Sequence, residues 1–191
     1  LVPEELEQLE RLSLTDKHMK LQKSLDAFLF CCYAGMRYSD FTNLSKKNIV
    51  DINQETWLIY KSVKTGTEVR LPLYLLFAGK GIVILNKYRN NLENFFRLRD
   101  NSNINKDLII IAKLAGLSKK ISFHTARHTN ATLLIYNGVN ITTVQKLLGH
   151  KSVKTTQVYT NIMDMTIVHD LEKIKQAALG IKKKTDNSFN K

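Results

Sequence analysis

Cysteines, long apolar segments and acidic residues are all scarce in this sequence, and each scarcity excludes a class of protein. The 191 residues include two cysteines, Cys31 and Cys32, which are adjacent. Adjacent cysteines rarely bridge each other, so the disulfide framework of a small secreted domain is excluded. The pair lies in an apolar helical run, and we expect both thiols to be core residues in a reducing compartment.

No apolar run approaches the roughly 18 residues that a helix needs to cross a bilayer. The longest apolar cluster, residues 26–36, is flanked by charge, so we expect no membrane-spanning helix and no membrane partner. Hydrophobic residues make up 43% of the chain and charged residues 24%. That composition is typical of a globular protein rather than a disordered one.

The shortage of acidic residues leaves a large positive charge. There are 17 Asp and Glu against 29 Lys and Arg, a formal net charge of +12. Such an excess indicates a polyanionic partner, because neutralising phosphates releases counterions. We expect this partner to be nucleic acid. An acidic membrane surface is less favoured, since no long basic amphipathic helix with aromatic anchors is visible.

The apolar pattern predicts an α+β fold, mostly helical with a small three-stranded antiparallel sheet. Three segments rich in β-branched and aromatic residues, 48–52, 56–63 and 68–73, predict the strands, with Gly66 in the second turn. Asp16 is the expected cap of a helix that ends at Gly35, and residues 94–103 are an expected loop. Helices are expected over 4–12, 16–34, 36–48, 74–92, 105–117, 124–138, 141–150 and 152–164.

The stretch HTARH places His124, Arg127 and His128 on one face of a helix, because they are spaced at i, i+3 and i+4. A zinc hydrolase would need a Glu in this segment and a third ligand, and neither is present nearby. Arginine offers a planar fork of donors, and histidine can exchange a proton near neutral pH. The stretch is therefore better suited to a phosphate than to a metal.

Residues 130–150 also resemble a helix-turn-helix, with Gly138 at the turn. That pattern alone would indicate a protein that reads the major groove of DNA. Any helical hairpin with a glycine turn looks similar, so a non-catalytic DNA-binding regulator is one alternative.

Two more basic residues lie where they could meet an anion. Arg37 follows an apolar helix end, where an arginine is costly unless it holds an anion, and Asp40 could steady its guanidinium. Lys64 stands at the tip of the expected hairpin, with Lys61 nearby as an alternative. Taken singly, each also fits an ordinary surface position.

His150 follows Gly149 at a helix end, and Tyr159 comes nine residues later. A phenol has a pKa of about 10 and is a poor nucleophile unless cations favour the phenolate. We expect arginines around one phosphate to lower the pKa of Tyr159.

The ordered set GMRYSD, VKTG, HTARHT, LLGH and TTQVYTN resembles the catalytic domain of the tyrosine recombinases, or phage-integrase family. The resemblance covers nearly the whole chain. The KTG hairpin followed by VRLPL is most similar to integrases of mobile and conjugative elements. Residues 1–179 would form the catalytic domain, with a C-terminal helix at about 165–179, and residues 180–191 a disordered tail. The core-binding domain that usually precedes it is expected to be absent from this chain.

The resemblance implies a role for each residue of the set. Tyr159 would attack the scissile phosphate, which Arg37 and Arg127 would clamp. Lys64 would donate a proton to the leaving 5′-hydroxyl. His124 would assist proton transfer at the tyrosine, and His150 would hydrogen-bond the phosphate. The residue at position 40, Asp40, would support the site rather than the chemistry.

The same resemblance implies a site-specific recombinase that cleaves and rejoins double-stranded DNA through a 3′-phosphotyrosyl intermediate. It would act as a tetrameric synapse in the cytoplasm, at the nucleoid, with the C-terminal helix docking between protomers. No cofactor or metal is implied, in agreement with the lack of a carboxylate cluster for Mg²⁺. A type IB topoisomerase shares the chemistry, but the Leu-Gly-His histidine and its spacing to Tyr159 favour a recombinase.

Overall fold

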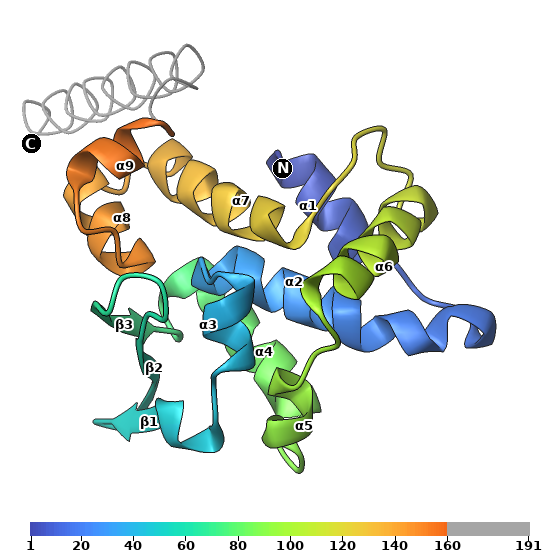
Figure 1. Cartoon of the computed structure of the whole chain (residues 1–191), viewed down its shortest axis with the longest axis horizontal. Coiled ribbons are helices and arrows are strands. Elements are labelled where there is room, and N and C mark those ends of the chain that lie inside the picture. Colours follow the sequence, from blue (N-terminus) through green and yellow to red (C-terminus); the bar gives the residue numbers. More distant parts are fainter. Residues whose placement is uncertain (160–191) are drawn as a thin grey trace, which may run out of the picture.

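Helices surround a central helix on one side of the molecule, and a small sheet lies on the other (Figure 1). The computed structural model describes residues 1–159. The helices within them are α1 (Pro3–Glu10), η1 (Asp16–Leu21), α2 (Gln22–Ala34), α3 (Tyr38–Thr42), η2 (Lys46–Asn48), η3 (Leu76–Gly79), α4 (Lys80–Lys87), α5 (Leu92–Phe96), α6 (Asn101–Leu114), α7 (Phe123–Tyr136), α8 (Ile141–Leu148) and α9 (Val153–Gln157). The predicted α+β fold is confirmed.

The central helix α2 is buried on every side from Ser24 to Ala34, because α1, α4, α5, α6 and α7 all pack against it. Its two cysteines, Cys31 and Cys32, are fully buried, as predicted. Gly35 ends the helix in the left-handed region, with φ +66°. A Cβ there would lie 2.7 Å from the Asn130 side-chain oxygen, so only glycine fits. The C-terminal end of α2 and Gly35 therefore lie against α7.

An aromatic cluster fixes the helices beneath the site. Phe41 of α3 packs edge-on against Phe95 and Phe96 of α5, with ring centroids 5.3 and 5.5 Å apart. Phe30 of α2 and Phe123 of α7 complete the cluster. Burial of each ring contributes about 2–3 kcal/mol, and edge-to-face pairs add to that. The first turns of α3 and α7 are therefore held in fixed positions.

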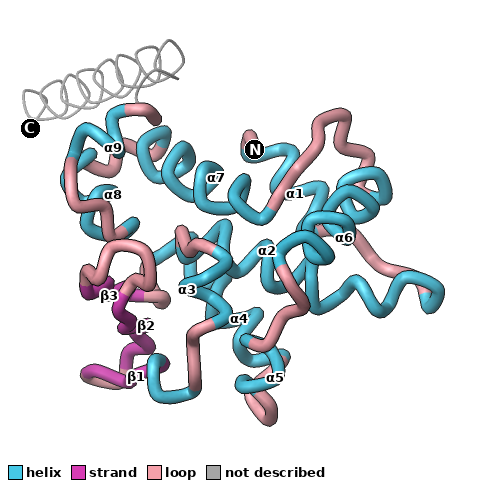
Figure 2. Tube along the Cα trace, viewed as in Figure 1, coloured by secondary structure: helices cyan, strands magenta, loops and turns pink. Residues whose placement is uncertain are grey.

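The sheet consists of β1 (Ile49–Ile52), β2 (Glu55–Lys61) and β3 (Glu68–Pro72), antiparallel in the order β1-β2-β3 (Figure 2). Leu58 pairs with Leu71 and Tyr60 with Val69, and all four are buried. Strand β3 also contacts α8. The turn between β2 and β3 carries Lys64, so the sheet places this lysine beside the helical part of the molecule.

Three local predictions were wrong, each for a physical reason. Asp16 does not cap a helix, since residues 16–21 form a 3₁₀ turn whose cap position is Thr15. The expected loop at 94–103 contains the end of α5 and the start of α6, because side chains of Asn91 and Asp100 cap these helices by accepting backbone N–H bonds. The expected helix at 74–92 is interrupted at Phe77, which adopts positive φ.

Some predictions fall beyond this part of the chain. The C-terminal helix at 165–179 and the tail at 180–191 lie outside the described residues. Within residues 1–159, no helix combines the length and the apolar character that a bilayer crossing requires.

Candidate active site

Arg37, Lys64 and His124 come from three separate segments and line one hollow of about 320 Å³. Arg37 follows α2, Lys64 lies in the β2–β3 turn and His124 lies in the first turn of α7. Tyr38, Ser39 and Asn101 complete the lining. The positive charges of Arg37 and Lys64 both contribute to lowering the pKa of His124, after burial and the neighbouring His128 and Arg127. This hollow is therefore a basic pocket of a size that suits a phosphate group.

Asp40 holds Arg37 at the edge of this hollow. Its carboxylate lies 3.5 Å from the Arg37 guanidinium, which also donates a hydrogen bond of 3.3 Å to Ser62. The Asp40 side chain is fully buried and accepts a 2.8 Å hydrogen bond from the Val63 backbone N–H. A buried carboxylate with these partners ties α3 to the base of the hairpin that carries Lys64. One acidic residue thus positions two cations of the site.

Arg127 lies beneath the surface and is only 1% exposed. It donates 2.7 Å hydrogen bonds to the carbonyl of Gly35 and to that of Leu148. Burial, together with the charge of Arg37, lowers the pKa of Arg127 to about 10. The group stays charged at neutral pH, and its mutual repulsion with Arg37 shows that both guanidinium groups lie in one electrostatic environment.

Tyr159 lies in that same environment and is 7% exposed. Burial raises the pKa of Tyr159, while Arg127 and Arg37 act in the opposite direction. We predicted that the arginines would lower this pKa overall, and that prediction is wrong for the free chain. The two charges do favour the phenolate, but the loss of hydration around a nearly buried phenol outweighs them.

His150 stacks parallel to Tyr159, with ring centroids 6.4 Å apart and planes inclined by 2°. Its Nδ1 lies 2.8 Å from the Thr156 hydroxyl. Burial lowers the pKa of His150 to about 4, and Arg127 and Arg37 add to the effect. The imidazole is therefore neutral near pH 7 and carries a single proton.

The ring of His128 lies between those of His124 and Tyr159. It lies edge-on to His124 at 4.5 Å between centroids and contacts the Tyr159 ring at 5.2 Å. Burial lowers the pKa of His128, and Arg127 lowers it further. The three rings form a row that runs from the hollow to the phenol.

The structure thus brings together the cations, histidines and tyrosine that the sequence singled out. Sequence reasoning did not assign a role to His128, Ser62 or Thr156. His128 was visible as the neighbour of Arg127, but nothing in the sequence placed it against Tyr159. Ser62 and Thr156 gave no signal, since hydroxyl residues are common and their partners are distant in the chain.

The arrangement can bind an anionic phosphate group and present a phenol to it. Two guanidinium groups, an ammonium and a neutral imidazole all offer donors, which suits a phosphoryl group that gains charge in a transition state. Within residues 1–159, no three His, Cys, Asp or Glu side chains are placed to bind a metal ion together.

The fold and the site together identify the class of protein, because the chain has the architecture of tyrosine recombinase catalytic domains. The phage integrase family profile matches residues 1–165, and the chain belongs to this family.

Similar proteins agree with this assignment. Tyrosine recombinase XerC of Rickettsia prowazekii (strain Madrid E) is 30% identical over 159 residues, which are 78% of this chain and 49% of the relative. A crystal structure of XerA recombinase superposes with a TM-score of 0.70 at 25% identity, covering 91% of this chain and 64% of that one. A lambda integrase tetramer bound to a Holliday junction shares the fold at 20% identity, with a TM-score of 0.66 and coverage of 83% and 47%. The chain spans about half the length of the XerC relative.

Proposed function

We propose that this chain is the catalytic part of a site-specific recombinase that cleaves and rejoins double-stranded DNA through Tyr159. The observation that carries the proposal is that Tyr159 packs against His128 and His150, where the charges of Arg127 and Arg37 both favour its phenolate. A phenol beside two guanidinium groups serves little purpose in a protein that only binds DNA. Attack by its oxygen on phosphorus needs such a charged setting, because the pentacovalent transition state is more anionic than the diester.

The cleavage step follows from the placement of these groups. The Tyr159 oxygen forms a bond to phosphorus, the bond from phosphorus to the 5′ oxygen breaks, and the DNA remains joined to the protein as a 3′-phosphotyrosyl ester. Arg37 and Arg127 bind the non-bridging oxygens. Arg127 uses one N–H of each terminal nitrogen on protein carbonyls, and an arginine has five N–H donors, so donors remain for the phosphate.

Two proton transfers accompany this step. Because burial raises the pKa of Tyr159, its phenol is protonated in the free chain and must lose a proton as it attacks. In this scheme His124 accepts that proton by way of His128, whose ring lies between those of His124 and Tyr159. Lys64 lines the hollow with Arg37 and protonates the leaving 5′ oxygen. A second 5′-hydroxyl then attacks the phosphotyrosyl ester and reverses the bonding on a new strand, so no external energy source is consumed.

The supporting residues have roles in this scheme as well. Asp40 fixes Arg37 and the turn that carries Lys64 relative to each other, through contacts with the Arg37 guanidinium and with the Val63 N–H. His150 is neutral and donates a hydrogen bond to the phosphate. The net charge of +12 favours binding of the DNA backbone around the site.

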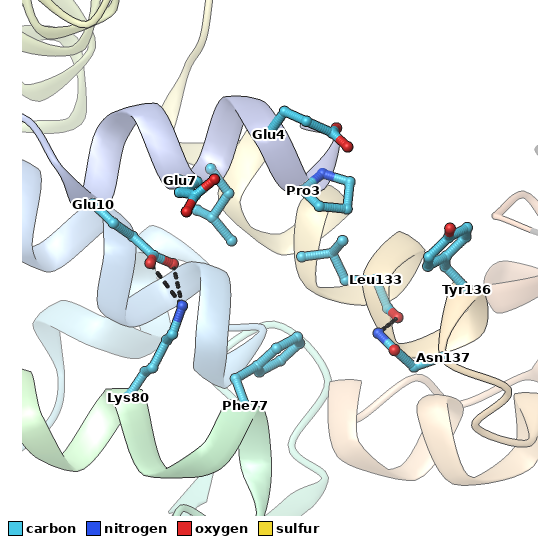
Figure 3. A pocket seen from close by; sticks show the side chains of 10 residues that line it. Pro3, Glu4, Glu7, Glu10, Phe77, Lys80, Leu133, Tyr136 and Asn137 are labelled. Atoms are coloured by element: carbon cyan, nitrogen blue, oxygen red, sulfur yellow. Dashed lines mark hydrogen bonds and ion pairs between the residues drawn. The ribbon is translucent and has the colours of Figure 1, made fainter.

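We further propose that copies of the chain assemble on DNA, as lambda integrase does as a tetramer on a Holliday junction. A groove of about 470 Å³ between α1, η3, α4 and α7 could receive a segment of a neighbouring copy (Figure 3). Glu4, Glu7 and Glu10 lie along one side of it, Phe77 and Leu133 supply apolar surface, and Lys80 of the same lining pairs with Glu10. The segment 167–184 combines apolar residues with several lysines, which complements this acidic and apolar lining.

Two more specific assignments, the kind of parent element and the location in the cell, stay predictions. Kinship with integrases of mobile elements rests on the hairpin sequence, while the similar proteins include both Xer recombinases and lambda integrase. A location at the nucleoid follows from DNA as the substrate.

Capture of DNA on a suicide substrate tests the proposed activity. After attack, a nicked duplex that carries a candidate core site loses the short fragment that begins with the new 5′-hydroxyl, which traps the covalent complex for a denaturing gel. Tyr159→Phe should abolish this complex while DNA binding in a mobility-shift assay changes by less than about threefold, since only a hydroxyl is removed. Tyr74→Phe is the matched control, because Tyr74 packs on Trp57 of the sheet instead of lying among the site residues.

Covalent capture by the Tyr159→Phe variant would show that another residue is the nucleophile. Specific DNA binding by the unaltered chain without any nicking on scanned substrates would favour the non-catalytic regulator.

A further inference from the structure

Thr156 lies between two residues of the proposed site and is fully buried. It belongs to α9, and its hydroxyl oxygen is 2.8 Å from His150 Nδ1. Its backbone carbonyl accepts a 3.0 Å hydrogen bond from the Tyr159 N–H. One short helix thus touches the histidine with a side chain and the tyrosine with its backbone.

The His150 backbone is held independently of its ring. The His150 N–H donates to the Gln145 carbonyl at 3.0 Å, and the Gln145 side-chain amide donates back to the His150 carbonyl at 3.1 Å. These bonds fix the chain but leave the imidazole free to rotate about χ2. The hydrogen bond with the Thr156 hydroxyl favours the ring orientation in which Nδ1 faces α9 and Nε2 lies on the opposite edge of the ring.

The same contact determines which nitrogen carries the proton. A neutral imidazole has one N–H and one acceptor nitrogen. A helical threonine could instead donate its hydroxyl proton to the carbonyl four residues earlier. Among the hydrogen bonds of residues 1–159, the Thr156 hydroxyl bonds only to His150 Nδ1. When the hydroxyl donates to Nδ1 in this contact, the ring proton is on Nε2.

We propose that Thr156 is a positioning residue that aims the Nε2–H of His150 at the scissile phosphate and docks the segment carrying Tyr159 in the same contact. This inference rests on the proposed recombinase function for its catalytic consequence. It assigns to a buried threonine a role that acts through His150 rather than on the DNA itself.

Two substitutions at Thr156 distinguish the loss of the hydroxyl from a change in side-chain volume. Thr156→Val keeps the volume and removes the donor, whereas Thr156→Ser keeps the donor. Thr155→Val is the matched control, because Thr155 lies on the same helix but is exposed. Single-turnover cleavage should fall about tenfold in Thr156→Val, as expected for one lost hydrogen bond. DNA binding should change by less than about threefold, and both Thr156→Ser and Thr155→Val should cleave at nearly the rate of the unaltered chain.

A double-mutant cycle with His150→Gln tests whether the threonine acts through the histidine. If it does, Thr156→Val costs less than about threefold more once His150 is already replaced. Equal losses in both backgrounds, or a Thr156→Val variant that cleaves like the unaltered chain, would overturn the inference.

An NMR titration of the His150 ring needs no DNA and distinguishes this inference from the proposed function. A donor on Nδ1 stabilises the neutral ring, so Thr156→Val should raise the pKa of His150 above its present value of about 4, while Thr156→Ser should not. An unchanged titration in Thr156→Val would refute the contact even if cleavage is seen. Failure of the unaltered chain to cleave any DNA, with the titration as expected, would instead refute the recombinase assignment and with it the catalytic part of this inference.

Discussion

Replacement of Gly149 by alanine should destabilise the chain through two separable effects. Gly149 ends α8 in the left-handed region, with φ +62°, which costs an alanine about 1–2 kcal/mol. A Cβ at this position would lie 2.6 Å from Val69 Cγ2 of β3, and Val69 is buried. Forcing extra volume into a packed contact costs about 1–3 kcal/mol. We therefore expect Gly149→Ala to lower the free energy of unfolding by about 3.5 kcal/mol, the middle of the combined range.

Gly116→Ala isolates the first effect. Gly116 also has positive φ, at +75°, but a Cβ there would meet no atom within 4 Å. Urea unfolding followed by circular dichroism should show a loss of about 1–2 kcal/mol for Gly116→Ala. Adding Val69→Ala should recover part of the loss in Gly149→Ala, because it removes the clashing methyl group. The reasoning is refuted if Gly149→Ala costs no more than Gly116→Ala, or if the Val69 and Gly149 substitutions simply add.

Two further results are expected. Asp40→Asn should lower the free energy of unfolding by about 3 kcal/mol in urea titrations, because it leaves Arg37 without its buried carboxylate; a loss under about 1 kcal/mol would contradict this. Because the pKa of His150 is about 4 in the folded chain and near 6.5 when unfolded, the unfolded chain binds more protons between these values, and stability should fall as pH drops from 6.5 to 4. The His150→Gln variant should show a shallower fall, and an equal fall would mean that His150 is not responsible.

The fold was largely predictable because its main elements carry strong local patterns. The central helix has an apolar run from Ala27 to Ala34 that ends at Gly35, and Gly66 marks the turn between the second and third strands. The errors occur where a single side-chain contact decides the outcome. Asn91 and Asp100 cap two helices inside a polar stretch, and no periodicity reveals that these carboxamide and carboxylate oxygens find backbone donors.

The residues of the site could be predicted from the sequence, but their burial and the contacts between them could not. Motif order indicated Arg37, Arg127 and Tyr159 because each lies in a recognisable stretch of sequence. The pKa of Tyr159 was predicted in the wrong direction, because burial depends on how distant segments pack. The contact between Thr156 and His150 depends on the angle at which α9 returns, which no spacing rule supplies.

The depth at which Arg127 lies has a consequence for how salt should affect the two stages of the reaction. At 0.1 M salt, mobile ions largely screen interactions between exposed charges that lie more than about 10 Å apart, but they screen a charge that is 1% exposed far less. The proposed association with DNA would depend on exposed lysines and counterion release, and should weaken steeply as salt is added. In the proposed mechanism, bound DNA places its phosphate against the guanidinium of Arg127, and the surrounding protein keeps mobile ions away from this contact. Salt should therefore slow encounter much more than bond breaking, and saturating DNA should restore most of the rate.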